Sequence, residues 1–60
     1  MKLIEIRKDD LYVFKKAVSH VYYDDEYGGY YICMMNGKEY KIGENKDDVK
    51  KIINILNEEQ

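Results

Sequence analysis

The sequence has no proline and no tryptophan, and it has only one cysteine and one histidine among its 60 residues. A single cysteine, Cys33, excludes an internal disulfide, and Cys33 with His20 cannot complete the four-ligand set of a structural zinc site. Small domains use such links because a chain this short removes only about 60% of its unfolded surface from water on folding. A second subunit is therefore the leading source of extra stability.

Long apolar runs and an excess of basic charge are also missing. The uninterrupted apolar stretches are a few residues long, whereas a helix needs about 20 to span a bilayer, and the N-terminal segment lacks the hydrophobic core of a signal peptide. The 12 acidic residues outnumber the 10 basic ones, which disfavours neutralisation of nucleic-acid phosphates. We expect a cytoplasmic protein with no membrane partner and no general affinity for nucleic acid.

The sequence contains no signature of catalysis or of cofactor binding. The glycines at 28 and 29 belong to neither a GxGxxG nor a Walker pattern. A catalytic pair of Cys33 and His20 would need a third orienting group, and none is indicated. The acidic run at 24–26 lacks the alternating oxygen ligands of a calcium loop, so a solvated loop is its first interpretation. We expect a non-enzymatic protein that uses no cofactor and no metal.

The residue pattern predicts a single domain, residues 1–60, that begins with strands. "KLIEIRK" at 2–8 alternates, with Ile4 and Ile6 on one side, and Asp9 with Asp10 then marks a turn. Residues 11–21 fit two structures. The apolar spacing allows a helix, whereas the β-branched and aromatic content favours a strand "LYVF", a tight connection "KKAV" and a strand "SHVYYD". We adopt the strands.

The dipeptide Asn36-Gly37 between two alternating runs predicts a hairpin with a two-residue type I′ turn. That turn places Cys33 opposite Tyr40 and Tyr31 opposite Ile42. This odd-numbered side of the first strand then receives the helix. The opposite face carries a mixture of apolar and charged side chains: Tyr30, Ile32, Met34, Glu39 and Lys41.

The C-terminal segment predicts an amphipathic helix from Lys46 to Asn57 with Asn45 as its N-cap. The apolar stripe on this helix consists of Val49, Ile52, Ile53 and Leu56, with Ile55 on its flank. The fold class is therefore α+β: a small antiparallel β-meander of four to five short strands with one C-terminal helix packed on one face.

Six of the seven tyrosines lie between residues 22 and 43. Tyrosine is typical of protein interfaces, because its ring gives contact area while its hydroxyl stays hydrogen-bonded. We expect a homodimer that also binds an unidentified protein, although these rings could simply cover a twisted sheet, and Tyr27 could be folded back on its loop. The predicted partner-binding residues are Tyr22, Tyr27, Tyr30, Ile32, Met34, Asp24, Asp25 and Glu26.

The order of the V-S-x-V strand, the glycine loop, N-G-K-E and the final helix resembles small phage and low-GC bacterial meander-plus-helix proteins, among them phage anti-defence proteins of the Hachiman anti-defence type. The resemblance implies an accessory or inhibitory factor of a phage or mobile element that acts by binding, in the host cytoplasm if phage-encoded. It transfers no functional residue. The alternative function is a single-stranded nucleic-acid-binding module that stacks bases on the tyrosines at 22, 23, 30 and 31.

Overall fold

A computed structural model describes residues 2–7 and 10–58 and confirms the α+β fold class. The elements are five antiparallel strands in two sheets, one 3-10 turn and one C-terminal α-helix. Their bounds are β1 Leu3–Arg7, β2 Leu11–Phe14, η1 Lys15–Ala17, β3 Val18–Asp24, β4 Gly29–Met34, β5 Glu39–Gly43 and α1 Lys46–Asn57. The sheets have the orders β1-β2 and β3-β4-β5.

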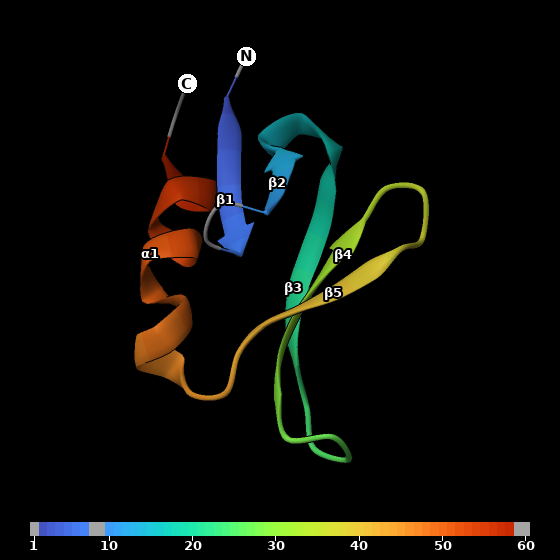
Figure 1. Cartoon of the computed structure of the whole chain (residues 1–60), viewed down its shortest axis with the longest axis vertical. Coiled ribbons are helices and arrows are strands. Elements are labelled where there is room, and N and C mark those ends of the chain that lie inside the picture. Colours follow the sequence, from blue (N-terminus) through green and yellow to red (C-terminus); the bar gives the residue numbers. More distant parts are fainter. Residues whose placement is uncertain (1, 8–9, 59–60) are drawn as a thin grey trace.

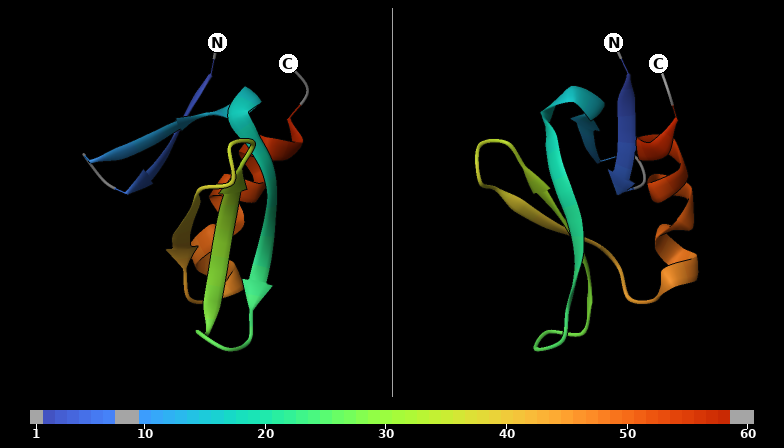
Figure 2. Two further views of the ribbon diagram at one scale, coloured as in Figure 1. Left: turned by 90° about the vertical axis from the view of Figure 1, so that its right-hand side faces the viewer. Right: turned by 180° about the vertical axis from the view of Figure 1, so that it is seen from behind.

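The core lies between the three-stranded sheet, the β1–β2 hairpin and α1 (Figure 1). In the left view of Figure 2, the three-stranded sheet stands in front of α1 and turns its other face to the viewer. Among the described residues, α1 is too short and too polar to cross a membrane. The buried apolar side chains come from β1, β2, β4 and α1: Ile4, Val13, Ile32, Met34, Val49 and Ile52.

Residues 11–21 form strands rather than a helix. The structure retains only one 3-10 turn, η1, where the tight connection was predicted, and β2 and β3 flank it. The alternation of β1 is also confirmed, since Ile4 is buried and Ile6 packs against the core while Leu3 is exposed. In the predicted turn, the Asp10 amide donates to the Arg7 carbonyl at 3.1 Å. Asp9 lies outside the described residues.

The hairpin between β4 and β5 has a three-residue loop, so the predicted two-residue turn is wrong. Cys33 lies opposite Glu39 and Ile32 opposite Tyr40, one residue away from the expected register. The Gly37 amide donates to the Met34 carbonyl at 2.9 Å, and Gly37 has a φ of 92°. This is the pattern of a β-turn followed by a left-handed glycine, a common alternative use of the same Asn-Gly pair.

The longer loop reverses the predicted faces of β4. Ile32 is fully buried and Met34 is 8% exposed, so both face the core rather than solvent. The observed register brings Ile32 onto the same face as Tyr40, which packs against the core. The two-residue loop would instead have placed Ile32 beside Lys41. Because the register follows the burial of apolar side chains, the alignment that unites the apolar residues of both strands prevails.

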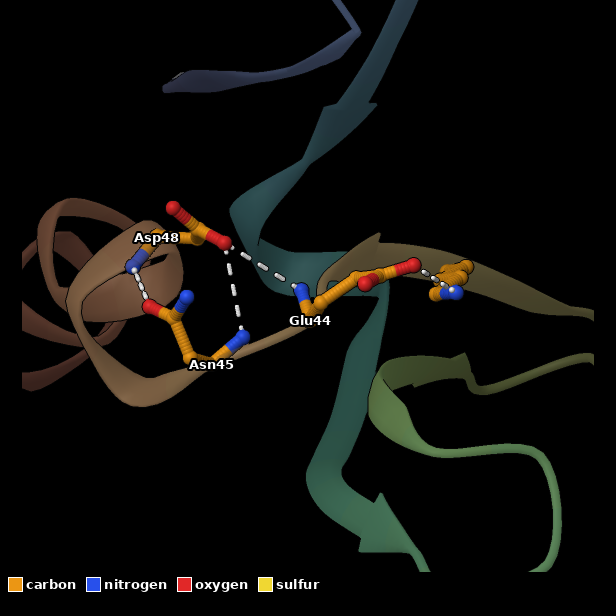
Figure 3. Close-up of polar contacts among 4 residues, drawn as sticks. Glu44, Asn45 and Asp48 are labelled. Carbon is orange, nitrogen blue, oxygen red and sulfur yellow. Dashed lines mark hydrogen bonds and ion pairs between the residues drawn. The ribbon is translucent and has the colours of Figure 1, made fainter.

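The helix α1 has the predicted bounds and the predicted N-cap. The Asn45 side-chain oxygen accepts a hydrogen bond from the Asp48 amide at 3.1 Å, and the Asp48 carboxylate accepts bonds from the Asn45 and Glu44 amides at 3.4 Å (Figure 3). This reciprocal capping box satisfies amides that the first helical turn leaves without partners. It fixes the point at which the chain leaves β5 and turns into α1.

Two lysines connect the N-terminal half of the chain to the end of α1. The Lys2 ammonium contacts the Glu58 carboxylate at 2.6 Å, and the Lys15 ammonium donates to the Glu58 carbonyl at 2.6 Å. The hydrogen bond from Lys2 holds the pKa of Glu58 below its ordinary value. Because all three residues are at the surface, these contacts orient the helix end more than they stabilise the fold.

Candidate functional site

The structure separates the eight predicted partner-binding residues into three regions. Ile32 and Met34 are buried in the core, so neither can contact a partner in this fold. Tyr30 is half-buried on the same inner side and meets Tyr23 edge-on, with ring centroids 5.0 Å apart. Tyr22 lies on the opposite face, and the remaining residues lie at the end of β3 and in the acidic loop that follows it. The predicted single binding face therefore does not exist.

The outer face of the three-stranded sheet carries an aromatic row instead. Tyr22 stacks on its cross-strand neighbour Tyr31, with ring centroids 5.8 Å apart and ring planes at 21°. The ring centroids of His20 and Tyr22 are 5.7 Å apart. No element of the described chain covers this face in Figure 2. The rings shield one another, so Tyr22 and Tyr31 are half-buried without belonging to the core.

Charged side chains of β5 border the aromatic row. Desolvation by its neighbours and a hydrogen bond with Glu39 raise the pKa of Tyr22 from 10.0 to about 12. On the same strand, the Lys41 ammonium contacts Glu44 at 3.0 Å, and this hydrogen bond raises the pKa of Lys41. The Lys41 charge, on the strand residue that pairs with Tyr31, is thus already paired with a carboxylate.

The Tyr22 hydroxyl should make the free energy of unfolding depend on pH in the alkaline range. Between pH of about 10 and 12 the unfolded chain loses the Tyr22 proton while the folded chain keeps it. Folded protein therefore binds more protons in this range, and the free energy of unfolding falls as the pH rises. Urea unfolding across this range should show a steeper fall for the parent chain than for Tyr22→Phe.

A control variant tests the cause of the raised pKa. Glu39→Gln removes the negative charge that disfavours a tyrosinate, so the pKa of Tyr22 should move down toward 10.0. The pKa is measured as the difference in ultraviolet tyrosinate absorbance between each protein and its Tyr22→Phe counterpart. An unchanged titration in Glu39→Gln would show that Glu39 does not act on Tyr22.

His20 and Cys33 are cross-strand neighbours on the outer face. His20 Nδ1 contacts the Ser19 hydroxyl at 3.0 Å, and Cys33 Sγ donates to the Met34 carbonyl at 3.6 Å. Each group thus interacts with its own sequence neighbour. Among residues 2–7 and 10–58, no cluster of three or more His, Cys, Asp or Glu side chains could hold a metal ion.

The acidic loop has one structural carboxylate and an exposed tip. The Asp24 side chain accepts hydrogen bonds from the Glu26 and Tyr27 amides at 2.8 and 3.0 Å, so it stabilises the turn. Asp25 and Glu26 are exposed, and Tyr27 is 72% exposed. Tyr27 therefore projects into solvent rather than folding back on the loop, and it remains available to a partner.

Four large exposed apolar side chains on or near the β1–β2 hairpin form a surface that sequence reasoning missed. We define the Phe14 surface as Leu3, Tyr12, Phe14 and Met35, which are between 48% and 70% exposed. Leu3 and Phe14 are cross-strand neighbours, and Tyr12, Phe14 and Met35 line one shallow groove of about 310 Å³. The signal was present in the sequence, because alternation around Val13 places Tyr12 and Phe14 together on the face away from the core.

A second groove of about 540 Å³ runs between β3 and the second half of α1. It follows β3 from Val18 to Tyr23, and its opposite wall includes Ile53 and Leu56. Tyr30 forms part of its lining. The groove therefore combines apolar side chains with the backbone of an edge strand, a combination that suits an added strand.

Comparisons with protein-family models, with curated proteins and with solved structures find no match for this chain.

Proposed function

We propose that this chain is a non-enzymatic protein-binding module that works as a homodimer and uses the Phe14 surface to contact another protein. The observation that carries this proposal is the continuity of that surface: Phe14, Tyr12 and Met35 share one groove, and each is at least 48% exposed. Clustered exposed apolar side chains mark interaction sites, whereas single ones need no explanation. Aromatic residues and methionine are also the types enriched at interfaces.

Homodimer formation accounts for the small core. Six apolar side chains are buried among the described residues, which is little for a domain without a disulfide. Association is one of the usual ways in which domains of this size gain stability.

The acidic loop has a separate role in this proposal. The loop between β3 and β4 stands at one end of the molecule (Figure 1), and its Asp25, Glu26 and Tyr27 side chains are exposed. Carboxylates in such a position accelerate encounter with a basic partner more than they tighten the complex. The proposed role as an inhibitory, anti-defence-like factor in the cytoplasm of a phage host depends on the resemblance to short phage proteins.

Paired variants test the Phe14 surface. Tagged protein carrying Phe14→Ser and Met35→Ser should lose the protein that the parent chain captures from host cells, because aromatic and methionine anchors carry much of such binding. Lys50→Ser, an exposed change on α1, should retain it. Circular dichroism must show all variants folded. Equal capture by the Phe14→Ser/Met35→Ser variant and by Lys50→Ser would contradict the proposal.

The second candidate is a single-stranded nucleic-acid-binding module. The stacked Tyr22–Tyr31 pair with His20 beside it gives this alternative its support, since bases stack on such rings. The tyrosines at 23 and 30 lie on the inner side and cannot extend this row. Glu39 and the Lys41–Glu44 pair oppose binding to phosphate. Absence of binding to a labelled oligothymidine at low salt would remove this candidate.

A further inference from the structure

The longest strand of the structure has a free edge. β3 pairs with β4 on one side only, and within the described residues no strand pairs with its other side. Proteins protect such edges with lysine, proline or a covering element. The β3 sequence, VSHVYYD, has neither lysine nor proline, and its protection is limited to a bulge between Val18 and His20. The edge is therefore open to another strand.

The charges at the two ends of β3 are opposite. Lys15 and Lys16 lie in η1, which precedes the strand, and Asp24, Asp25 and Glu26 end or follow it. Figure 1 places these two groups at opposite ends of the molecule. An antiparallel copy of the same strand reverses this order, so each basic end meets an acidic end.

We propose that the homodimer forms by antiparallel pairing of β3 with β3 of a second copy, which gives one continuous six-stranded sheet. The proposal specifies the homodimer of the proposed function and rests on it. The pairing is isologous, as a two-fold axis requires, and its centre is Val21, the middle residue of the strand. His20 of one copy then lies opposite Tyr22 of the other. The aromatic rows of both copies thereby join.

Beyond the paired strands, this arrangement brings η1 of each copy, which carries Lys16, toward the acidic loop of the other, which carries Glu26. Both side chains are exposed, and neither has an ion pair or side-chain hydrogen bond among the residues that the structure describes. The pairing also closes the groove beside β3, because Val21 and Tyr23 line both the groove and the proposed interface. The opposite charges at the two ends of β3, its free edge and the groove beside it thus all point to the same occupant, a second copy of this chain.

Charge reversal tests the register. Lys16→Glu alone should raise the dissociation constant of the dimer roughly tenfold, because two ion pairs become two repulsive contacts. Glu26→Lys alone should act similarly, and the double variant Lys16→Glu/Glu26→Lys should restore the affinity of the parent. Lys50→Glu alters the net charge by the same amount as Lys16→Glu, but Lys50 lies on α1 and does not line the groove beside β3, so this change should have little effect. Sedimentation velocity over a concentration series measures all five proteins.

A second variant tests the edge itself. Tyr23 is 50% exposed on β3, so Tyr23→Lys inserts a charge into the interface without replacing a core residue, and it should give a folded monomer. A dimer that neither Tyr23→Lys nor the charge reversals weaken would overturn the β3 interface and leave the homodimer standing. A monomer at every concentration would overturn both. The Phe14 surface is tested separately by its own variants.

Discussion

Ile32→Ala is expected to lower the free energy of unfolding by about 3 kcal/mol, because it empties a fully buried site at the centre of the core. Ile32 contributes to the cluster that joins both sheets and α1. A domain of this length has a total stability of roughly 3–9 kcal/mol, so this one substitution removes a large part of it. Urea unfolding followed by circular dichroism gives the difference directly.

The matched control for Ile32→Ala is Cys33→Ala, one residue along the same strand. Cys33 is half-buried on the outer face, so its truncation should cost less than about 1 kcal/mol. Equal losses for the two variants, or a larger loss for Cys33→Ala, would show that the faces of β4 are assigned the wrong way round.

Gly43→Ala is expected to destabilise the fold by about 1–3 kcal/mol, because β5 ends against the first turn of α1 at this residue. A Cβ atom on Gly43 would lie 2.8 Å from Asp48 Cβ and 2.9 Å from Val49 Cγ1. Val49 is fully buried and Asp48 is held by the capping box, so neither atom can move aside easily. The strand end or the helix must shift instead.

The neighbouring variant Glu44→Ala is the control for Gly43→Ala. Glu44 is exposed and contacts Lys41 at 3.0 Å, so its removal should cost less than about 1 kcal/mol. Unfolding curves for both variants measure the comparison. A Gly43→Ala protein as stable as the parent would show that β5 and α1 do not approach as closely as described.

The sequence predicted the elements better than it predicted their faces. Asn45, followed by an amphipathic stripe, specified the cap and the bounds of α1, because capping and helical periodicity are local properties. β-branched and aromatic residues similarly specified β2 and β3. The connection between these strands was also predicted, since one 3-10 turn occupies residues 15–17.

The faces of β4 could not be derived locally because both sides of this strand are apolar. Ile32 and Met34 alternate with Tyr31 and Cys33, so periodicity alone does not select the buried side. Asn36-Gly37 also permits two loop lengths, and one residue of difference in the loop exchanges the faces. The choice depends on where Tyr40 and Ile42 of β5 pack, which is a tertiary property.

The Phe14 surface was missed for a related reason. The β1–β2 hairpin has two faces, and the way in which it docks on the rest of the fold decides which of them remains exposed. The pairs of β1 and β2 place Ile4 opposite Val13 in the core and Leu3 opposite Phe14 outside it. The alternation was visible in the sequence, whereas the absence of a covering element was not.

The most direct test of these assignments compares two adjacent methionines, Met34 and Met35, by NMR. Met34 is 8% exposed and faces the core, and Met35 is 70% exposed on the Phe14 surface. A soluble paramagnetic agent should broaden the Met35 methyl signal strongly and leave that of Met34 almost unchanged. Strong broadening of Met34, or protection of Met35 equal to that of Met34, would contradict the account.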